Sequence, residues 1–279
     1  MDGILCVNKP AGMTSFDVCA LIRRKFQCKV GHTGTLDPMA TGVMLIALGK
    51  STKLVQYLTH AQKTYQATCR LGLKTNTGDI WGEVIERKPF KELRKEDIEP
   101  VLDSFVGKSM QLPPMVSAIK IDGKKLYEYA RKSQKVDVPL REIEVHSVKL
   151  NGIRENELVF TICVSAGTYI RTICEDIGIR FDTVATLSGL ERLAIGDFTI
   201  NQSMELDELM ADKDVRWIDP LTALKHYRQV TVDDPTLIVH GKKIDLPYQD
   251  DKILFVLNNK PFAFYRKEDG LYRSERGLW

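Results

Sequence analysis

The stretch GHTGTLDPMATG, residues 31–42, carries one acidic side chain, Asp37, among glycines and threonines. Its three glycines permit positive φ angles and a close approach of the backbone to a ligand. Pro38 disfavours helical backbone at Asp37, so we expect an extended or turn conformation from which the carboxylate projects. The stretch therefore predicts a loop that presents a carboxylate, with an ordinary Asp-Pro turn as the structural alternative.

The surroundings of Asp37 are strongly basic. Between Val18 and Gly78 the chain has nine lysines and arginines, and Asp37 is its only acidic residue. A polyanion that approaches this surface is repelled by a lone carboxylate. The position of Asp37 therefore indicates that it acts chemically on such a polyanion or is neutralised by a specific cation.

Composition excludes a disordered chain and places any nucleic-acid signal in local clusters. The 279 residues are 43% hydrophobic, which is sufficient for a packed core in one or two domains. The net charge is only +3, so the whole chain is mildly basic. Residues 108–141 hold eight basic and three acidic side chains. This cluster indicates either an RNA-binding segment or a solvated helix face with long basic stems.

The cysteines and the apolar segments favour a cytoplasmic protein without a metal site. The six cysteines form no C-x-x-C pair and no cluster at zinc spacing, so we expect reduced, apolar side chains. The chain starts on a strand-like segment without a charged leader. Its longest apolar run, residues 43–48, is too short to span a bilayer.

The first 200 residues mix strands and helices without regular alternation. A helix is expected to begin after Thr14, with Asp17 in the capping-box position. Residues 65–71 alternate apolar and polar side chains, which predicts a strand with one buried face that includes Tyr65. Further strands are predicted at 4–7, 43–48, 143–150 and 158–164, and further helices after 51, at 91–105 and at 168–180.

Composition changes after residue 220, where the segments become short and strand-like. Strands are predicted at 253–257, 262–265 and 271–273, with turns at 258–259 and 268–270. We expect a small β-rich unit over residues 225–279 that follows a larger unit over residues 1–224. Its basic and aromatic side chains could contact RNA, or the unit could serve only to stabilise the protein.

Several motifs occur in the order expected for one enzyme family. Residues 31–42 resemble the catalytic signature of the TruB family, the pseudouridine synthases that act on uridine 55 in the TΨC arm of bacterial transfer RNA. Similar matches are NKPAGMTS at 8–15, KTY at 63–65, GTYIR at 167–171 and LERLAIGDF at 190–198. The segment QLPPMVSAIK at 111–120 resembles an insertion of the stand-alone bacterial enzymes. The resemblance covers about residues 2–200.

This resemblance implies the pseudouridine synthase fold, of the α/β (α+β) class. The expected sheet is mixed, bent and largely antiparallel, with an inserted RNA-binding segment at about 108–141 and a PUA-like β-barrel at the C-terminus. The implied reaction converts uridine 55 of transfer RNA to pseudouridine by base flipping, and it needs no cofactor. Transfer RNA is the expected partner, with no membrane, no obligate protein partner and a monomeric state.

The resemblance also implies roles for particular side chains. Asp37 is the expected nucleophile, Arg171 the cation that pairs with it, and Tyr65 the platform under the flipped uracil, with a phenol that can help remove the C5 proton. Tyr169 and Leu190 are expected to line the pocket of the same base, and Lys9 to support the catalytic loop. His32 is expected to bind the substrate by filling the space that the flipped base vacates or by contacting the RNA loop. Without the resemblance, the sequence would predict that Tyr65 is a core residue, that His32 lies in a turn and that Arg171 is a surface residue at the start of a helix. Candidates for RNA backbone contacts are basic residues in two segments: Arg23, Arg24, Lys25, Lys120, Lys124, Lys125 and Arg131.

Other functions remain open from the sequence. A catalytic subunit of a guide-RNA-dependent pseudouridine synthase shares the aspartate loop. An RNA-binding or tRNA-folding protein would keep its effect without Asp37. A glycoside hydrolase normally uses two acids that flank the bond, and no second acid lies near Asp37 in the sequence. The sequence is compatible with three mechanisms: attack by Asp37 on ribose C1′, attack by Asp37 on uracil C6, and a glycal pathway.

Overall fold

The structure is a computed structural model that describes residues 2–132, 134, 136–211 and 214–279. Its body is built on one large sheet. The strands of this sheet are β1 (Gly3–Lys9), β2 (Val30–His32), β3 (Thr41–Leu48), β4 (Lys63–Leu71), β7 (Gly107–Gln111), β10 (Arg141–Arg154), β11 (Glu157–Val164), β12 (Ala185–Ile195), β13 (Phe198–Thr199), β14 (Met204–Glu205) and β15 (Trp217–Ile218).

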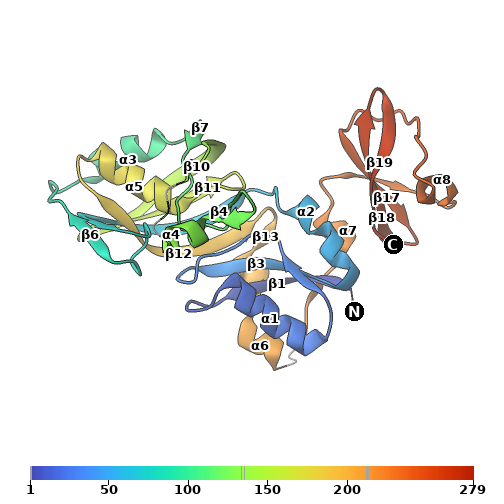
Figure 1. Ribbon diagram of the computed structural model, residues 1–279, viewed down its shortest axis with the longest axis horizontal. Helices are drawn as coiled ribbons and strands as arrows, with labels where there is room; N and C mark the ends of the chain where they lie inside the picture. Colours follow the sequence, from blue (N-terminus) through green and yellow to red (C-terminus); the bar gives the residue numbers. More distant parts are fainter. Residues whose placement is uncertain (1, 133, 135, 212–213) are drawn as a thin grey trace.

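The sheet has the order β14-β1-β3-β12-β4-β11-β10-β7 (Figure 1). Strands β2, β13 and β15 pair with β3, β12 and β1. Two neighbouring pairs are parallel, β1 with β14 and β12 with β3, whereas the other pairs in this sheet are antiparallel. The prediction of a mixed, largely antiparallel sheet is therefore confirmed.

The helices connect the strands along the chain. They are α1 (Ser15–Phe26), the 3-10 helix η1 (Gly49–Leu54), α2 (Val55–Leu58), α3 (Lys95–Asp103), α4 (Leu126–Arg131), α5 (Ile170–Arg180), the 3-10 helix η2 (Ile200–Gln202), α6 (Leu206–Met210), α7 (Pro220–Ala223) and α8 (Thr236–Val239).

Helix α1 begins as predicted. The Asp17 amide donates to Thr14 Oγ1 at 3.1 Å and the Thr14 amide donates to the Asp17 carboxylate at 2.9 Å, which completes a capping box. Helices α3 and α5 begin later than the predictions at 91 and 168. Arg94 and Tyr169 have extended backbone, so each ends a preceding segment before its helix starts.

The core follows the predicted strand patterns. Strand β3 is buried from Gly42 to Leu48, as expected for a central strand with an apolar sequence. In β4 the side chains of Tyr65, Ala67, Cys69 and Leu71 are buried on one face. This face and the neighbouring β11 enclose the main core, against which α1 and α5 pack.

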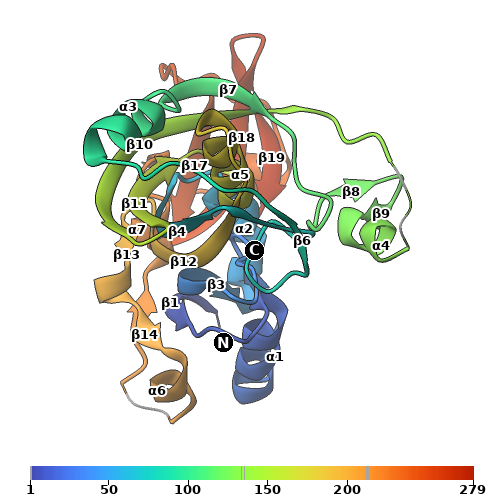
Figure 2. The same ribbon diagram turned by 90° about the vertical axis from the view of Figure 1, so that its left-hand side faces the viewer.

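The segment predicted as an insertion at about 108–141 begins and ends in strands of the main sheet. Its first residues, 108–111, belong to β7 of the main sheet, and Arg141 begins β10. What projects from the body is the hairpin β8 (Lys120–Ile121) and β9 (Lys124–Lys125), followed by α4 (Figure 2). Residues 133 and 135 of the predicted insertion lie outside the described residues. A second hairpin consists of β5 (Leu73–Thr75) and β6 (Val84–Arg87).

A separate four-stranded sheet, order β16-β17-β18-β19, lies at one end of the long axis (Figure 1). Its strands are β16 (Arg228–Thr231), β17 (Lys252–Leu257), β18 (Lys260–Glu268) and β19 (Leu271–Gly277). This sheet packs against α2, where the rings of Tyr57 and Phe264 stack with centroids 3.5 Å apart. The strand-rich C-terminal region is therefore confirmed, while the boundary at 224 and the PUA-like barrel stay predictions.

Candidate active site

The loop that carries Asp37 connects β2 to β3 and is hydrogen-bonded to the first residue of α1. Ser15 Oγ accepts from the Leu36 amide at 2.8 Å and lies 3.2 Å from the Leu36 carbonyl oxygen, to which it donates. The Gly12 amide donates to the Pro38 carbonyl at 2.9 Å. The two neighbours of Asp37 are thereby bound to the first residue of α1 and to the turn before it, which fixes the position of the Asp37 backbone.

Lys9 supports the same loop from the end of β1. It is fully buried, and its ammonium donates to the carbonyls of Pro10 at 2.8 Å, Met13 at 2.7 Å and Pro38 at 3.4 Å. Burial lowers the pKa of Lys9 to about 8, although the charge of Asp37 opposes this change. Lys9 thus occupies the supporting position that the sequence predicts.

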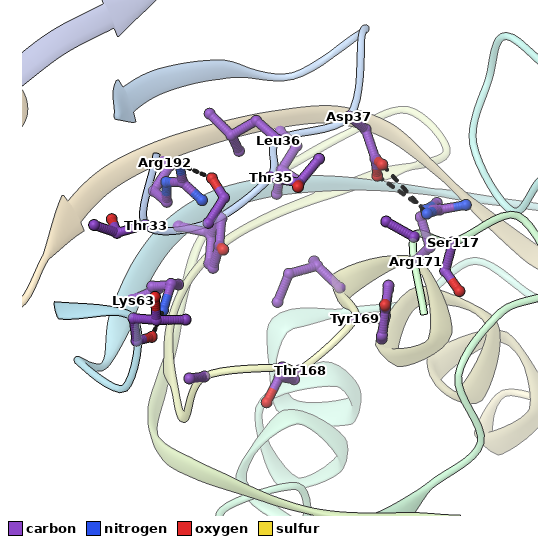
Figure 3. Close-up of a pocket in the computed structure, with 18 residues that line it drawn as sticks. Thr33, Thr35, Leu36, Asp37, Lys63, Ser117, Thr168, Tyr169, Arg171 and Arg192 are labelled. Carbon is purple, nitrogen blue, oxygen red and sulfur yellow. Dashed lines mark hydrogen bonds and ion pairs between the residues drawn. The ribbon is translucent and has the colours of Figure 1, made fainter. Parts of the chain in front are cut away.

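Asp37 and Arg171, 134 residues apart in the chain, form an ion pair with two contacts. Nε of Arg171 lies 3.0 Å from Oδ2 of Asp37, and Nη2 lies 3.3 Å from Oδ1 (Figure 3). Two further N–H groups of the guanidinium bind backbone oxygens, since Nη1 donates to Thr77 O and Nη2 to Val116 O, both at 2.9 Å. The geometry brings together the two residues predicted to pair and holds the guanidinium in one orientation.

The environment of Asp37 shifts its pKa upward. Burial of the carboxyl raises its pKa, Arg171 opposes the rise, and the nearby charge of Asp79 adds to it. The side chain of Asp37 is still 31% exposed, whereas that of Arg171 is 4% exposed. The carboxylate therefore faces an opening while its partner is enclosed.

This opening is a cavity of about 270 Å³ between the Asp37 loop and the start of α5. Three predicted base contacts, Tyr65, Tyr169 and Leu190, line it together with Asp37 and Arg171. The complete lining is Thr33, Gly34, Thr35, Leu36, Asp37, Thr59, Lys63, Tyr65, Ser117, Ala118, Ala166, Gly167, Thr168, Tyr169, Ile170, Arg171, Leu190 and Arg192.

Tyr169 is oriented by a side chain that sequence reasoning missed. The Tyr169 amide donates to Gln111 Oε1 at 2.8 Å, and Gln111 Nε2 donates to the Tyr169 carbonyl at 3.1 Å. Gln111 is buried at the end of β7. Burial raises the pKa of the Tyr169 phenol, which therefore stays protonated at neutral pH. The start of α5 is thus fixed to a strand 58 residues away in the chain.

Two buried cations, Lys63 and Arg192, line the cavity on the side away from Arg171 (Figure 3). Arg192 donates from Nε to Val43 O at 2.7 Å and from Nη2 to Gly34 O at 3.0 Å. Lys63 donates to the carbonyls of Thr59 and Ala61, both at 2.9 Å, and burial lowers its pKa to about 8. Both residues lie within the motifs quoted above, KTY and LERLAIGDF, but no role was predicted for them.

Asp79 is a second acid near Asp37 in the structure. It is 42 residues away in the sequence, so sequence reasoning did not identify it as a neighbour of Asp37. Its Oδ1 accepts from Thr77 Oγ1 at 3.0 Å and from the Trp81 amide at 3.1 Å. It raises the pKa of Asp37 without lining the cavity. The two carboxylates that flank a bond in a glycoside hydrolase are therefore not reproduced by Asp37 and Asp79.

His32 lies beside the cavity but does not line it. Its Nδ1 accepts from the Gly34 amide at 3.3 Å. Burial lowers the pKa of His32, and the charge of Arg192 lowers it further, which favours the neutral imidazole. The structure therefore places His32 as a support of residues 32–34 next to the predicted base site.

The residues predicted to contact RNA phosphates lie outside the cavity, in two segments. Arg23 and Arg24 are exposed in the last turn of α1, and Lys25 donates to Met210 O at 3.1 Å. In the projecting segment the side chains of Lys120, Lys124 and Arg131 are exposed. Lys125 there is half-buried, with Nζ 5.3 Å from the centroid of the Tyr127 ring.

The described residues show no group of three or more His, Cys, Asp or Glu side chains that could hold a metal ion. The six cysteines are free thiols. In the described part of the chain, no helix has the length and apolar character needed to cross a membrane.

Comparisons with known proteins place the chain in one family. Residues 23–170 match the N-terminal domain of TruB family pseudouridylate synthases. A protein of Oenococcus oeni named tRNA pseudouridine synthase B is 42% identical over 99% of this chain and 98% of its own length. Proteins of the same name from Oceanobacillus iheyensis and Clostridium perfringens are 40% and 36% identical, over 95% and 100% of this chain and 93% and 97% of theirs.

Solved structures show the same fold. A chain of a Cbf5-Nop10-Gar1 complex superposes with a TM-score of 0.75 at 24% identity, over 99% of this chain and 85% of that chain. A chain of an H/ACA RNP bound to a substrate RNA that contains 2′-deoxyuridine gives a TM-score of 0.74 at 23% identity, over the same shares of the two chains. The Asp37 loop, its pairing with Arg171 and the extent of the sequence identity lead to one conclusion: the chain belongs to the TruB family of pseudouridylate synthases.

Proposed function

We propose that this protein converts uridine 55 in the TΨC loop of transfer RNA to pseudouridine, with Asp37 as the nucleophile. The observation that carries the proposal is the carboxylate of Asp37, held by Arg171 at the wall of a cavity of about 270 Å³. The names of the relatives, tRNA pseudouridine synthase B, support transfer RNA as the substrate. A cytoplasmic location of the protein is part of this proposal, because its proposed substrate, bacterial transfer RNA, is found there.

The target base must leave its stack to reach the carboxylate. Unstacking costs a few kcal/mol, and a pocket that contacts both faces and the edge of the base offsets this cost. Tyr65 is 7% exposed and lines the cavity, so its ring offers a face for the uracil. Tyr169 and the half-buried Leu190 line the same space and would hold the opposite side of the base.

The reaction is an isomerisation in which the atoms balance within the nucleotide. The C1′–N1 bond breaks, the uracil rotates, a C1′–C5 bond forms, and the proton lost from C5 is matched by one gained at N1. Asp37 forms and releases a transient bond during this sequence, so it must start as a carboxylate. Arg171 stabilises that charged form against the burial that raises the pKa of Asp37.

The lining of the cavity also favours retention of the detached uracil. After C1′–N1 cleavage the base carries negative charge, and nothing covalent holds it to the ribose while it rotates. Lys63 and Arg192 give the cavity wall positive charge on the side away from Arg171. Such fixed charges act strongly where water is excluded, so they favour retention of the free base.

The substitution Asp37→Asn tests this proposal. The neutral amide keeps the shape of the side chain but cannot act as the nucleophile. We expect the variant to bind an unmodified tRNA transcript like the wild type and to form no pseudouridine, whereas the wild type forms it at one mapped position. Asp182→Asn, at a 98% exposed side chain, is the matched control and should retain full activity. Turnover by Asp37→Asn would remove Asp37 from the nucleophile role.

The same experiment separates the alternatives. It contains no guide RNA and no second protein, so product formation favours the stand-alone enzyme over a guide-dependent subunit. The likeness to the Cbf5 complexes, at 24% identity or less, concerns the fold alone. If Asp37→Asn still speeds the recovery of a misfolded tRNA, a folding role exists beside the chemistry. Light scattering of the purified protein tests the expected monomer.

A further inference from the structure

One tryptophan of the loop that contacts the catalytic arginine is largely exposed. Trp81 is 60% exposed, and its ring stacks on no other aromatic ring among the described residues. The other two tryptophans each contact a ring, Trp217 that of Phe26 and Trp279 that of Phe262. An indole is the side chain with the most apolar area to bury, so its exposure leaves a large aromatic face available to another molecule.

The exposure of Trp81 is set by a turn. The Gly82 amide donates to Asp79 O at 3.1 Å, which makes Trp81 the third residue of a four-residue turn. The Trp81 amide donates to Asp79 Oδ1 at 3.1 Å. At the base of the turn, Asn76 and Glu83 exchange two hydrogen bonds of 3.0 Å. These bonds hold the backbone and leave the indole outside.

The same loop is attached to the catalytic arginine. Arg171 Nη1 donates to Thr77 O at 2.9 Å, and a Cβ atom on Gly78 would lie 3.5 Å from Cβ of Arg171. The amide of Ile80 donates to Leu187 O of β12 at 2.9 Å. Trp81 is therefore four residues from a direct contact of the Asp37–Arg171 pair, although it does not line the cavity itself. The backbone of its loop is thus fixed to the arginine that holds Asp37.

We propose that Trp81 stacks on an unpaired base of the substrate RNA, next to the nucleotide that enters the cavity. The inference rests on the proposed function, because it needs an RNA loop at this site. Extrusion of one base removes a stacking partner from its neighbours, and an indole can replace that partner. The other side chains exposed on this hairpin include both charged and apolar ones: Glu83, Val84, Ile85, Glu86 and Arg87. An RNA base is the occupant inferred here because Thr77 of the same loop binds Arg171, so an RNA loop that places its base in the cavity passes beside this hairpin.

Tryptophan fluorescence tests the contact directly. The triple substitution Asp37→Asn, Trp217→Phe and Trp279→Phe leaves Trp81 as the sole tryptophan of an inactive protein. Filter binding measures the occupancy of unmodified tRNA, and thermal melting confirms folding. We expect the emission of Trp81 to be quenched, and its access to acrylamide to fall, in proportion to occupancy. Unchanged emission and access at full occupancy would overturn the inference.

Substitution of Trp81 gives the second measurement. Removal of one base–aromatic stack is expected to lower kcat/KM about 5- to 150-fold, mainly through KM, in Trp81→Ala. Trp81→Phe should recover most of the loss. Ile85→Ala, at a 59% exposed aliphatic residue of the same hairpin, is the control and should match the wild type. Equal kcat/KM in Trp81→Ala and the wild type contradicts the inference. Failure of the wild type to form pseudouridine contradicts the proposed function instead.

Discussion

Arg171 binds the carboxylate of Asp37 through two nitrogens, with Nε 3.0 Å from Oδ2 and Nη2 3.3 Å from Oδ1. The same guanidinium also donates to the backbone carbonyls of Thr77 and Val116. Thr77 lies in the β5–β6 hairpin and Val116 lies before β8. The orientation of the carboxylate therefore depends on two loops that belong to different parts of the chain.

Arg171→Lys is expected to lower kcat by about 10²- to 10³-fold. An ammonium can keep the charge but cannot make the two parallel contacts together with the backbone bonds, so the carboxylate loses its fixed orientation. Breaking a buried pair costs roughly 3–5 kcal/mol, of which this substitution forfeits a large part. Single-turnover assays on tRNA measure the effect. Arg180→Lys, at the exposed end of the same helix, should be near wild type; an equal loss there would indicate damage to α5.

The acid limb of the pH–rate profile should report Asp37. Its pKa is raised above 3.8, so activity is expected to fall, on acidification, at a higher pH than for an ordinary aspartate. The charge of Asp79 contributes to this rise. Asp79→Asn removes that charge and should move the limb to lower pH, as measured by kcat/KM from pH 4 to 7 under conditions where the protein stays folded. A shift to higher pH would contradict the assignment.

The sequence predicted local features well. The capping box at Thr14 and Asp17 and the buried face of β4 depend on neighbours within a few residues, and both are confirmed. The pairing of Asp37 with Arg171 came from the family motifs, because no local pattern links residues 134 positions apart.

The parts that sequence reasoning missed are long-range contacts. Gln111 was quoted only as the start of an insertion, yet it closes two hydrogen bonds with Tyr169 from the edge of the main sheet. Lys63 and Arg192 look like surface charges in the sequence, but the pairing of β12 with β3 and β4 buries them at the cavity wall. The order of the strands in the sheet determines where these three side chains lie, and no single segment of the sequence encodes that order.

Tyr65 should show separable effects of ring and hydroxyl. Tyr65→Phe keeps the ring, so tRNA affinity is expected to remain, while kcat falls if the phenol takes part in removal of the C5 proton. Tyr65→Ala removes the face under the uracil and should cost a further 1–3 kcal/mol, roughly, in kcat/KM. Fluorescence anisotropy with a labelled T-arm hairpin and product assays measure the two quantities. Equal kcat/KM for Phe and Ala would argue against stacking.

The projecting hairpin should dominate the salt dependence of tRNA binding. Lys120 and Lys124 are exposed there, and each phosphate contact releases counterions. Replacing both by alanine is expected to reduce the slope of log K against log salt by about 0.7–0.9 for each lost contact. Lys149→Ala, an exposed lysine of β10, serves as the control for lost charge and should leave the slope unchanged. An unaltered slope in the double variant would place the RNA elsewhere.

Two glycines with the same backbone angle provide a matched pair for the close contact behind the catalytic loop. Gly42 and Gly107 both have φ of +109°. A Cβ atom on Gly42 would lie 2.3 Å from the Arg192 carbonyl oxygen, whereas one on Gly107 would meet nothing within 4 Å. Alanine at either site incurs the strain of positive φ, but only Gly42→Ala must also push β3 away from β12.

Gly107→Ala is therefore expected to lower the free energy of unfolding by about 1–2 kcal/mol, and Gly42→Ala by about 3–5 kcal/mol. The Gly42 variant should also lose activity, because displacement of β12 moves Arg192 away from Val43 O and Gly34 O and so releases the Asp37 loop. Urea unfolding and product assays measure both effects. Equal destabilisation by the two substitutions would show that the backbone angle, and not the contact with Arg192, requires glycine at position 42.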